Sequence, residues 1–208
     1  MSDIICVTNR HLCEGDFLTR IEQIAKYRPA GIILREKDIA EDEYRVLARQ
    51  VMEICGRYDV NCILHTFVDV ALELQAEAIH LPLPVLRQIC ETEKEKCQSE
   101  HMQKLTEKFS VIGASCHSVE EAVEAQKMGC TYITAGHIFA TDCKKGLPPR
   151  GLPFLEQVCR SVSIPVFAIG GIALDNMPLV RQAGAAGGCI MSGLMKCQDV
   201  NAWLPDIS

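Results

Sequence analysis

The feature that most constrains the fold of this chain is a regular alternation of short apolar runs with amphipathic helical patterns over its 208 residues. Eight such runs are rich in apolar and branched side chains and are typical of buried strands: 4–8, 31–35, 62–65, 78–81, 111–115, 132–136, 166–170 and 188–192. Most are continuous rather than alternating, as expected of strands that are covered on both faces. Strands that alternate with helices indicate βαβ units and a parallel sheet.

Eight units predict a compact, single-domain (β/α)8 TIM barrel over residues 1–208. The length gives an average of 26 residues for each unit, which is near the lower limit for this fold. A doubly wound open sheet is the alternative, but it more often has five or six strands. Only 16 residues follow Ser192, so the last helix is expected to be short or incomplete.

Three segments carry clear helical patterns: 41–56, 118–128 and 174–183. Ser118 and Glu121 have the spacing of a capping box, and Gly129 is a typical helix stop. Asp175 is expected to cap the helix at 174–183. The charged stretch 91–108 is interpreted as a solvated helix or a loose connector rather than a linker between domains.

Charge and hydropathy exclude several classes of partner. The net charge is −6, which argues against a broad surface for nucleic acid or for an anionic membrane. No apolar run approaches the roughly 18 residues that span a bilayer, and the first residues lack the pattern of a secretion signal. We therefore expect a cytoplasmic protein. Assembly into a homo-oligomer is compatible with the sequence.

The chain has twelve cysteines, and no two of them have the C-x-x-C spacing. Neither a disulfide framework nor a zinc site is therefore expected, and most of these thiols should be reduced packing residues. Cys143 could in principle be a nucleophile, but the sequence fixes no base beside it.

In a TIM barrel the active site lies at the C-terminal ends of the strands, so the residues that follow each run are candidates. Arg35 ends the second run and Lys37 follows it, and both could bind an anion. Gly170 ends the seventh run, Gly171 follows it, and Gly193 follows the eighth. Glycines there let backbone N–H groups approach a phosphate, although a tight strand-to-helix turn would explain Gly170 and Gly171 equally simply.

Among the six histidines, His137 is the candidate acid/base, because it directly follows a predicted strand and precedes the apolar pair Ile-Phe. His80 lies inside a strand and is expected to be a satisfied core or rim residue. His117 precedes the capping serine and fits a helix entry as well as a site. The acidic residues Glu36 and Asp142 are isolated, so no metal site is expected.

Four segments together resemble the thiamine phosphate synthase and TenI superfamily: Leu34-Arg35-Glu36-Lys37, 113–122, 132–146 and 164–172. The resemblance extends over essentially the whole chain. It implies a TIM barrel that acts on a thiazole phosphate of thiamine biosynthesis.

Two branches of this superfamily differ in their motifs. Thiamine phosphate synthases carry Gln-Leu-Arg-Glu-Lys, then Asn-Asp after the third strand, then His-Leu-Gly-Gln-x-Asp after the fourth, and the acidic groups hold Mg²⁺ on a pyrophosphate. The matching segments here are Ile33-Leu-Arg-Glu-Lys37, His65-Thr66 and His80-Leu-Pro-Leu-Pro-Val85. Both metal-ligand acids are absent, and His65 stands where both branches commonly have Asn.

The loop 136–146 reads Gly-His-Ile-Phe-Ala-Thr-Asp-Cys-Lys-Lys-Gly, which is similar to TenI-type thiazole tautomerases rather than to the Gly-Pro-x-Phe-x-Thr-x-Thr-Lys of synthases. This resemblance implies that His137 is the catalytic acid/base and that neither a metal nor another cofactor is needed. It also implies the substrate contacts: Gly171, Met191 and Ser192 at the phosphate, Thr141, Asp142 and Cys143 along the thiazole, and Arg35, Lys37 or Lys144 at the carboxylate.

Three hypotheses follow. The first is a metal-independent thiazole tautomerase, which aromatises a carboxythiazole phosphate by proton transfer through His137. The second is a Mg²⁺-dependent thiamine phosphate synthase, which transfers a pyrimidine to a thiazole phosphate. The third is a regulatory protein that binds a thiazole phosphate without turnover.

Overall fold

The computed structural model describes residues 3–96 and 105–204, and its eight strands form a closed barrel in the order of the sequence. Every neighbouring pair of strands is parallel, including the closing pair β1 and β8. The strands are β1 Ile4–Val7, β2 Gly31–Leu34, β3 Cys62–His65, β4 Ala78–Pro82, β5 Val111–Cys116, β6 Tyr132–Gly136, β7 Val166–Ile169 and β8 Gly187–Ile190. The predicted single-domain TIM barrel is confirmed, with each strand boundary within two residues of its expected place.

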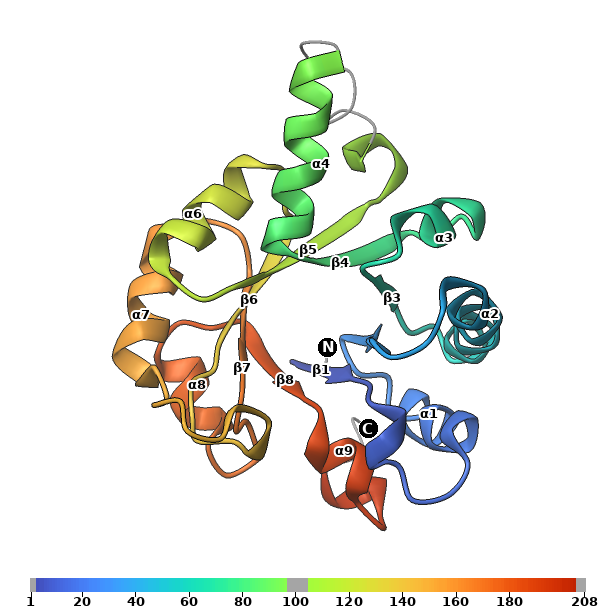
Figure 1. Ribbon diagram of the computed structural model, residues 1–208. Coiled ribbons are helices and arrows are strands. Elements are labelled where there is room, and N and C mark those ends of the chain that lie inside the picture. Colours follow the sequence, from blue (N-terminus) through green and yellow to red (C-terminus); the bar gives the residue numbers. More distant parts are fainter. Residues whose placement is uncertain (1–2, 97–104, 205–208) are drawn as a thin grey trace.

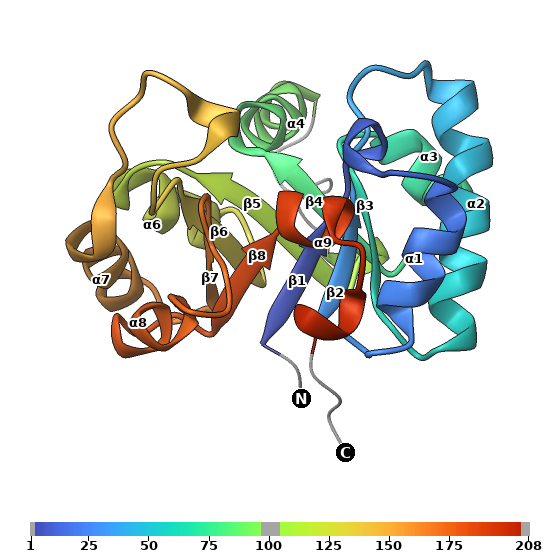
Figure 2. The ribbon, with the colours of Figure 1, turned by 90° about the horizontal axis from the view of Figure 1, so that it is seen from below.

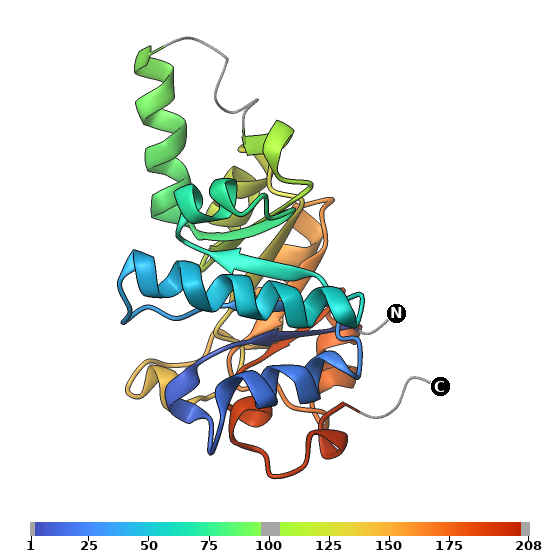
Figure 3. The ribbon, with the colours of Figure 1, turned by 90° about the vertical axis from the view of Figure 1, so that its right-hand side faces the viewer.

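The helices surround the barrel on its outer side (Figure 1). They are α1 Phe17–Ala25, α2 Glu41–Arg57, α3 Val68–Glu73, α4 Leu83–Lys96, α6 Val119–Lys127, α7 Gly151–Ser161, α8 Met177–Gln182 and α9 Ser192–Lys196, with short 3-10 turns η1 Arg10–Leu12, η2 Asp142–Lys144 and η3 Val200–Ala202. Figure 3 shows α4 extending beyond the body of the barrel. The last helix, α9, has only five residues, as the short chain remaining after Ser192 predicts.

The helix ends test the capping predictions. Ser118 caps α6 through a hydrogen bond from the N–H of Glu121, 3.1 Å long, as expected. The cap predicted at Asp175 is wrong, because α8 begins at Met177 with Asn176 before it. Of the charged stretch 91–108, residues 91–96 continue α4 and 105–108 are helical, and 97–104 lie outside the described residues.

The strands are apolar on both faces because each face packs against a different core. In β1, Ile4 and Cys6 belong to the layer between sheet and helices, whereas Ile5 and Val7 point into the barrel. The described cysteines are free thiols and six of them are buried, which agrees with their expected packing role. Within the described ranges, we find no helix with the length and apolar character that crossing a membrane requires.

Tyr44 joins α2 to two neighbouring strands. Its hydroxyl donates a hydrogen bond to the carbonyl of Leu34 (2.8 Å) and accepts one from the N–H of His65 (2.8 Å). The side chain is fully buried, so neither backbone group has water as a substitute partner. Tyr44 therefore holds the end of β2, which Arg35 directly follows, in a fixed position relative to the end of β3.

Tyr44→Phe should lower the free energy of unfolding by about 1–3 kcal/mol, because it leaves a buried carbonyl and a buried N–H without a partner. Urea unfolding followed by circular dichroism measures this change. Tyr58→Phe is the matched control, since the hydroxyl of Tyr58 donates to the side chain of Glu22 in a partly buried position. Equal losses in the two variants would contradict the role given to Tyr44.

The barrel interior contains two neighbouring histidines, His65 and His80, whose rings stack with centroids 5.8 Å apart. His80 is satisfied by Tyr132 and Ser115, whose hydroxyls lie 2.9 Å from its two ring nitrogens, as expected of a core histidine. Burial lowers the pKa of His80 to about 3. Burial also lowers the pKa of His65, to about 2, and nearby positive charge is the smaller cause of this shift. Both imidazoles are therefore neutral in the folded chain at pH 7.

This burial predicts a pH-dependent stability. Below about pH 6.5 the two histidines take up protons only when the chain unfolds, so the unfolded state binds more protons. The free energy of unfolding should fall as the pH drops from 6.5 towards 3, by about 1 kcal/mol for each pH unit and each histidine. His65→Asn should give a shallower fall between pH 6.5 and 5 in urea unfolding. Identical slopes in the two proteins would refute this account.

Candidate active site

A cavity of about 280 Å³ lies at the mouth of the barrel, where the C-terminal ends of the strands meet. We call it the inner cavity. It is lined by residues at the ends of most strands and in the loops that follow them: Val7, Ile33, Arg35, Lys37, His65, His80, Pro82, Ser115, His117, Thr134, Gly136, His137, Thr141, Cys143, Lys144, Ile169, Gly170, Gly171, Ile172, Cys189, Met191 and Ser192. The long loop between β6 and α7 rises at one end of the barrel, and the ends of the described chain lie at the other (Figure 2).

His137 is held at this mouth by the main chain around it. Its carbonyl accepts a hydrogen bond from the N–H of Arg150 (3.0 Å), and the next residue, Ile138, donates to the carbonyl of Ile169 at the end of β7 (2.9 Å). The imidazole is half-buried, with Nε2 3.4 Å from the carbonyl oxygen of Leu147. One face of the residue therefore lines the inner cavity while its backbone is fixed on both sides.

Gly170 and Gly171 bring the loop after β7 close to the loop that carries His137. A Cβ atom on Gly170 would lie 2.3 Å from the Cβ of His137, and one on Gly171 would lie 2.6 Å from the carbonyl oxygen of Ala140. Both glycines also have positive φ, +94° and +66°. The tight turn considered from the sequence is therefore real, and it places main-chain groups at the cavity wall.

Three cationic side chains line the inner cavity: Arg35 and Lys37 after β2, and Lys144 in η2 after β6. Burial lowers the pKa of Lys37, and the charges of Arg35 and Lys144 lower it further. Cations from two loops that are distant in sequence therefore lie near one another. Such a cluster favours an anionic group of a ligand.

Most of the other predicted contact residues also reach the cavity. Thr141 and Cys143 line it, and the Thr141 hydroxyl accepts a hydrogen bond from the Cys143 N–H at the start of η2 (3.4 Å). Met191 and Ser192 line it from the end of β8. Asp142 is the exception among the predicted residues, because it is absent from the described lining and its carboxylate is 3.6 Å from the ammonium group of Lys145.

Several polar residues that line the inner cavity had no firm role from the sequence, among them His65, Ser115 and His117. His65 ends β3 and Ser115 is the last residue but one of β5, and this place near strand ends is the signal that could have selected them. The Nδ1 of His117 lies 2.9 Å from the carbonyl oxygen of Gly136, to which it donates. His117 therefore belongs to the site and is not only a helix-entry residue.

The donor set does not fit Mg²⁺, which prefers carboxylate and other oxygen ligands. No Asp or Glu lines the inner cavity in the part of the chain that the structure describes. The nearest acid in sequence to the cationic cluster, Glu36, is buried and accepts hydrogen bonds from the Thr8 hydroxyl (2.7 Å) and the Arg10 N–H (3.1 Å). Across residues 3–96 and 105–204, no group of three His, Cys, Asp or Glu side chains could hold a metal ion.

Comparison with known proteins agrees with this architecture. The model of a family described as thiamine monophosphate synthase matches residues 4–194. A "Thiamine-phosphate synthase" of Fusobacterium nucleatum is 34% identical over 94% of this chain and 90% of that protein. A "Thiamine-phosphate synthase 2" of Streptococcus pneumoniae is 32% identical over 94% of this chain and 89% of that protein.

A solved structure, thiamine phosphate pyrophosphorylase from Pyrococcus furiosus, superposes with a TM-score of 0.76 at 28% identity, covering 95% of this chain and 89% of that chain. These relatives carry the name of the transferase, so they favour the synthase alternative over the isomerase that the loop 136–146 indicates. By its family model and its relatives, the chain belongs to the thiamine monophosphate synthase family.

Proposed function

We propose that this chain is a thiazole tautomerase of thiamine biosynthesis, with His137 as the acid/base and no metal or other cofactor. The observation that carries the proposal is the setting of His137, which lines one cavity together with a cationic cluster and with the glycine loop after β7 that packs against it. A carboxythiazole phosphate carries two anionic groups, a carboxylate and a phosphate, which suit the cations and the glycine loop. Cytoplasmic location and assembly into a homo-oligomer stay predictions from the sequence.

The chemistry needs one proton to leave and one to arrive. A proton is removed from the ring carbon that bears the carboxylate, and a proton is delivered to the exocyclic carbon, so the ring becomes aromatic. A single imidazole can take the first proton and return it at the second carbon. In this proposal Arg35, Lys37 or Lys144 holds the carboxylate, and the backbone at Gly171 and Ser192 holds the phosphate.

The remaining predicted contacts lie along the ring. Thr141 and Cys143 would face the thiazole, and Met191 would support it from the end of β8. Asp142 was expected beside the ring as well, but its ion pair with Lys145 directs it elsewhere, and we assign it no contact with substrate.

Thiamine phosphate synthase is the second candidate, and the names of the relatives favour it. The segment Leu34-Arg35-Glu36-Lys37 is common to both activities. The lining argues the other way, because a pyrophosphate leaving group held through Mg²⁺ needs carboxylate ligands that the described inner cavity does not supply.

His137→Asn should reduce the rate of aromatisation by about 10²- to 10⁴-fold, since it removes the group that moves the proton. The ultraviolet absorbance of the aromatic product, formed from the carboxythiazole phosphate tautomer, follows the reaction. His11→Asn is the matched control, because His11 is an exposed histidine that pairs with Asp38. A folded His137→Asn protein with full activity would refute the isomerase proposal.

Arg35→Gln should raise KM by about tenfold and change kcat less, because it removes a charge-assisted hydrogen bond that holds the carboxylate in the ground state and the transition state alike. Steady-state kinetics of the same reaction separate the two parameters. Arg49→Gln on the exposed face of α2, where Arg49 pairs with Glu73, provides the control. A KM equal to that of the parent protein would exclude Arg35 from substrate binding.

The second candidate has its own test. The protein should form no thiamine phosphate from the pyrimidine pyrophosphate, a thiazole phosphate and Mg²⁺, because the described cavity lacks carboxylate ligands for the metal. Chromatographic detection of thiamine phosphate checks this expectation. Steady formation of thiamine phosphate would establish the synthase and replace the isomerase proposal.

A further inference from the structure

A second cavity lies beside the inner one, on the outer side of the loop between β6 and α7, and we call it the outer cavity. Its volume is about 480 Å³, which is within the range of sites for small organic ligands. It shares His117, Gly136, His137 and Lys144 with the inner cavity, and it adds Leu147, Pro148, Pro149 and Arg150. The proposed reaction makes no use of the four added residues.

Two cations at this cavity carry no internal countercharge. Within the described ranges, neither Lys144 nor Arg150 forms an ion pair with a carboxylate, whereas the adjacent Lys145 pairs with Asp142. No acidic residue of the described chain lines the cavity. In a protein of net charge −6, a cavity bordered by two unpaired cations is a local site for an anion.

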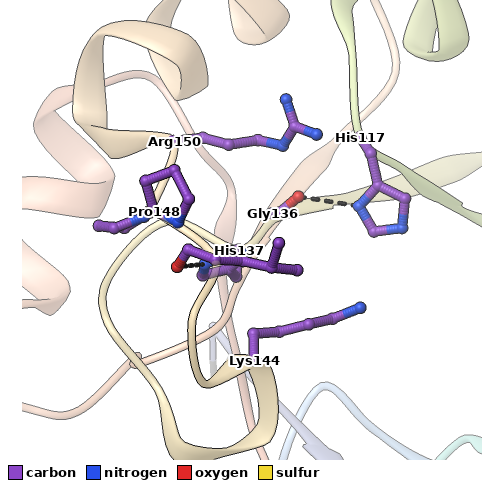
Figure 4. Close-up of a pocket in the computed structure, with 8 residues that line it drawn as sticks. His117, Gly136, His137, Lys144, Pro148 and Arg150 are labelled. Atoms are coloured by element: carbon purple, nitrogen blue, oxygen red, sulfur yellow. Dashed lines mark hydrogen bonds between the residues drawn. The ribbon is translucent and has the colours of Figure 1, made fainter.

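The side chains of Lys144 and Arg150 extend from the loop in the same direction, toward His117 (Figure 4). The Arg150 guanidinium carbon lies 5.2 Å from the centre of the Phe154 ring, so a cation–π contact orients the charged end of this side chain. His117 donates from Nδ1 to Gly136, so its Nε2 is the nitrogen left for a ligand. Nε2 can accept a hydrogen bond from a protonated phosphate oxygen or, when protonated itself, donate one.

The rest of the wall is apolar. Leu147 is 59% exposed, which is unusual for a large aliphatic side chain, and Pro148 and Pro149 follow it in the same wall. A free phosphate ion would leave this wall in water. A ligand that carries an apolar ring beside its anionic group would cover the wall and gain free energy from the burial.

We propose that the outer cavity is a second ligand site, which binds a phosphate monoester with an apolar, ring-sized body. The phosphate contacts Arg150 and Lys144, and the ring packs on Leu147 and the two prolines. The outer cavity shares His137 and Lys144 with the proposed reaction site, but its test does not depend on the isomerase proposal, because binding is measured without turnover and Arg150 lines only the outer cavity.

Phenyl phosphate and inorganic phosphate are the probes, titrated at low ionic strength in an isothermal calorimeter. The Arg35→Gln/Lys37→Gln double variant serves as the background, because it removes two cations of the inner cavity that would also attract phosphate. We expect phenyl phosphate to bind to this background, and the dependence of the affinity on Arg150 identifies the binding in the outer cavity, because Arg150 lines only that cavity. Adding Arg150→Gln should weaken the binding by about tenfold, the effect of one charge-assisted hydrogen bond.

Lys145→Gln on the same background is the matched control, since Lys145 is exposed, neighbours Lys144 and is absent from the described lining of both cavities. It should leave the affinity within about twofold, a difference below the effect of one hydrogen bond. Equal weakening by Lys145→Gln and Arg150→Gln would show general charge attraction and overturn the proposal. Absence of phenyl phosphate binding to the folded background protein would overturn it as well.

The apolar wall has a separate test. Phenyl phosphate should bind about fivefold more tightly than inorganic phosphate, because its ring buries apolar surface. Leu147→Ser should remove most of this preference, and Leu179→Ser, at another exposed leucine on α8, should leave it unchanged. If Leu147→Ser leaves the preference intact, the apolar wall does not contact the ligand and the proposed class of ligand is wrong.

Discussion

The site depends on the close approach of the loop after β7 to the loop after β6. At Gly170 there is no room for a side chain, because a Cβ would lie 2.3 Å from the Cβ of His137. The hydrogen bond from Ile138 to the carbonyl of Ile169, 2.9 Å long, keeps the two loops at this distance. The catalytic candidate is thus positioned by main chain on a rigid barrel and not by a side-chain partner, which leaves its imidazole available to both cavities.

The barrel could be predicted from the sequence because parallel strands covered on both faces read as continuous apolar runs. Both faces of β1 show this, since Ile4 packs under the helices while Ile5 packs inside the barrel. The first residue of a helix was less predictable, because neighbouring polar side chains compete for the free backbone N–H groups at its start. At α8, the side chain of Asn176 accepts from the N–H of Ala173, and the helix begins after Asn176 rather than at the expected Asp175.

The inner cavity was largely predictable for a related reason: all strands of the barrel end at one mouth, so residues that follow strands must meet there. Residues whose place depends on the path of a long loop were not. Asp142 lies in the short turn η2, where it pairs with Lys145. Arg150 is thirteen residues beyond His137 along the chain, yet its N–H binds the His137 carbonyl, a contact for which the sequence carries no local signal.

Electrostatics connects these findings with the chemistry. The chain is acidic as a whole, but its one buried acid near the mouth, Glu36, already accepts hydrogen bonds from Thr8 and Arg10 within the described structure. The charged side chains that line the two cavities in the described structure are therefore cationic, and backbone dipoles lie beside them. Such a lining favours anionic groups, whereas a divalent metal would find cations where it needs carboxylates. The segment at the end of β2 is common to both candidate reactions, so the choice between them rests on the ends of β3 and β4, where no carboxylate lines the described cavity.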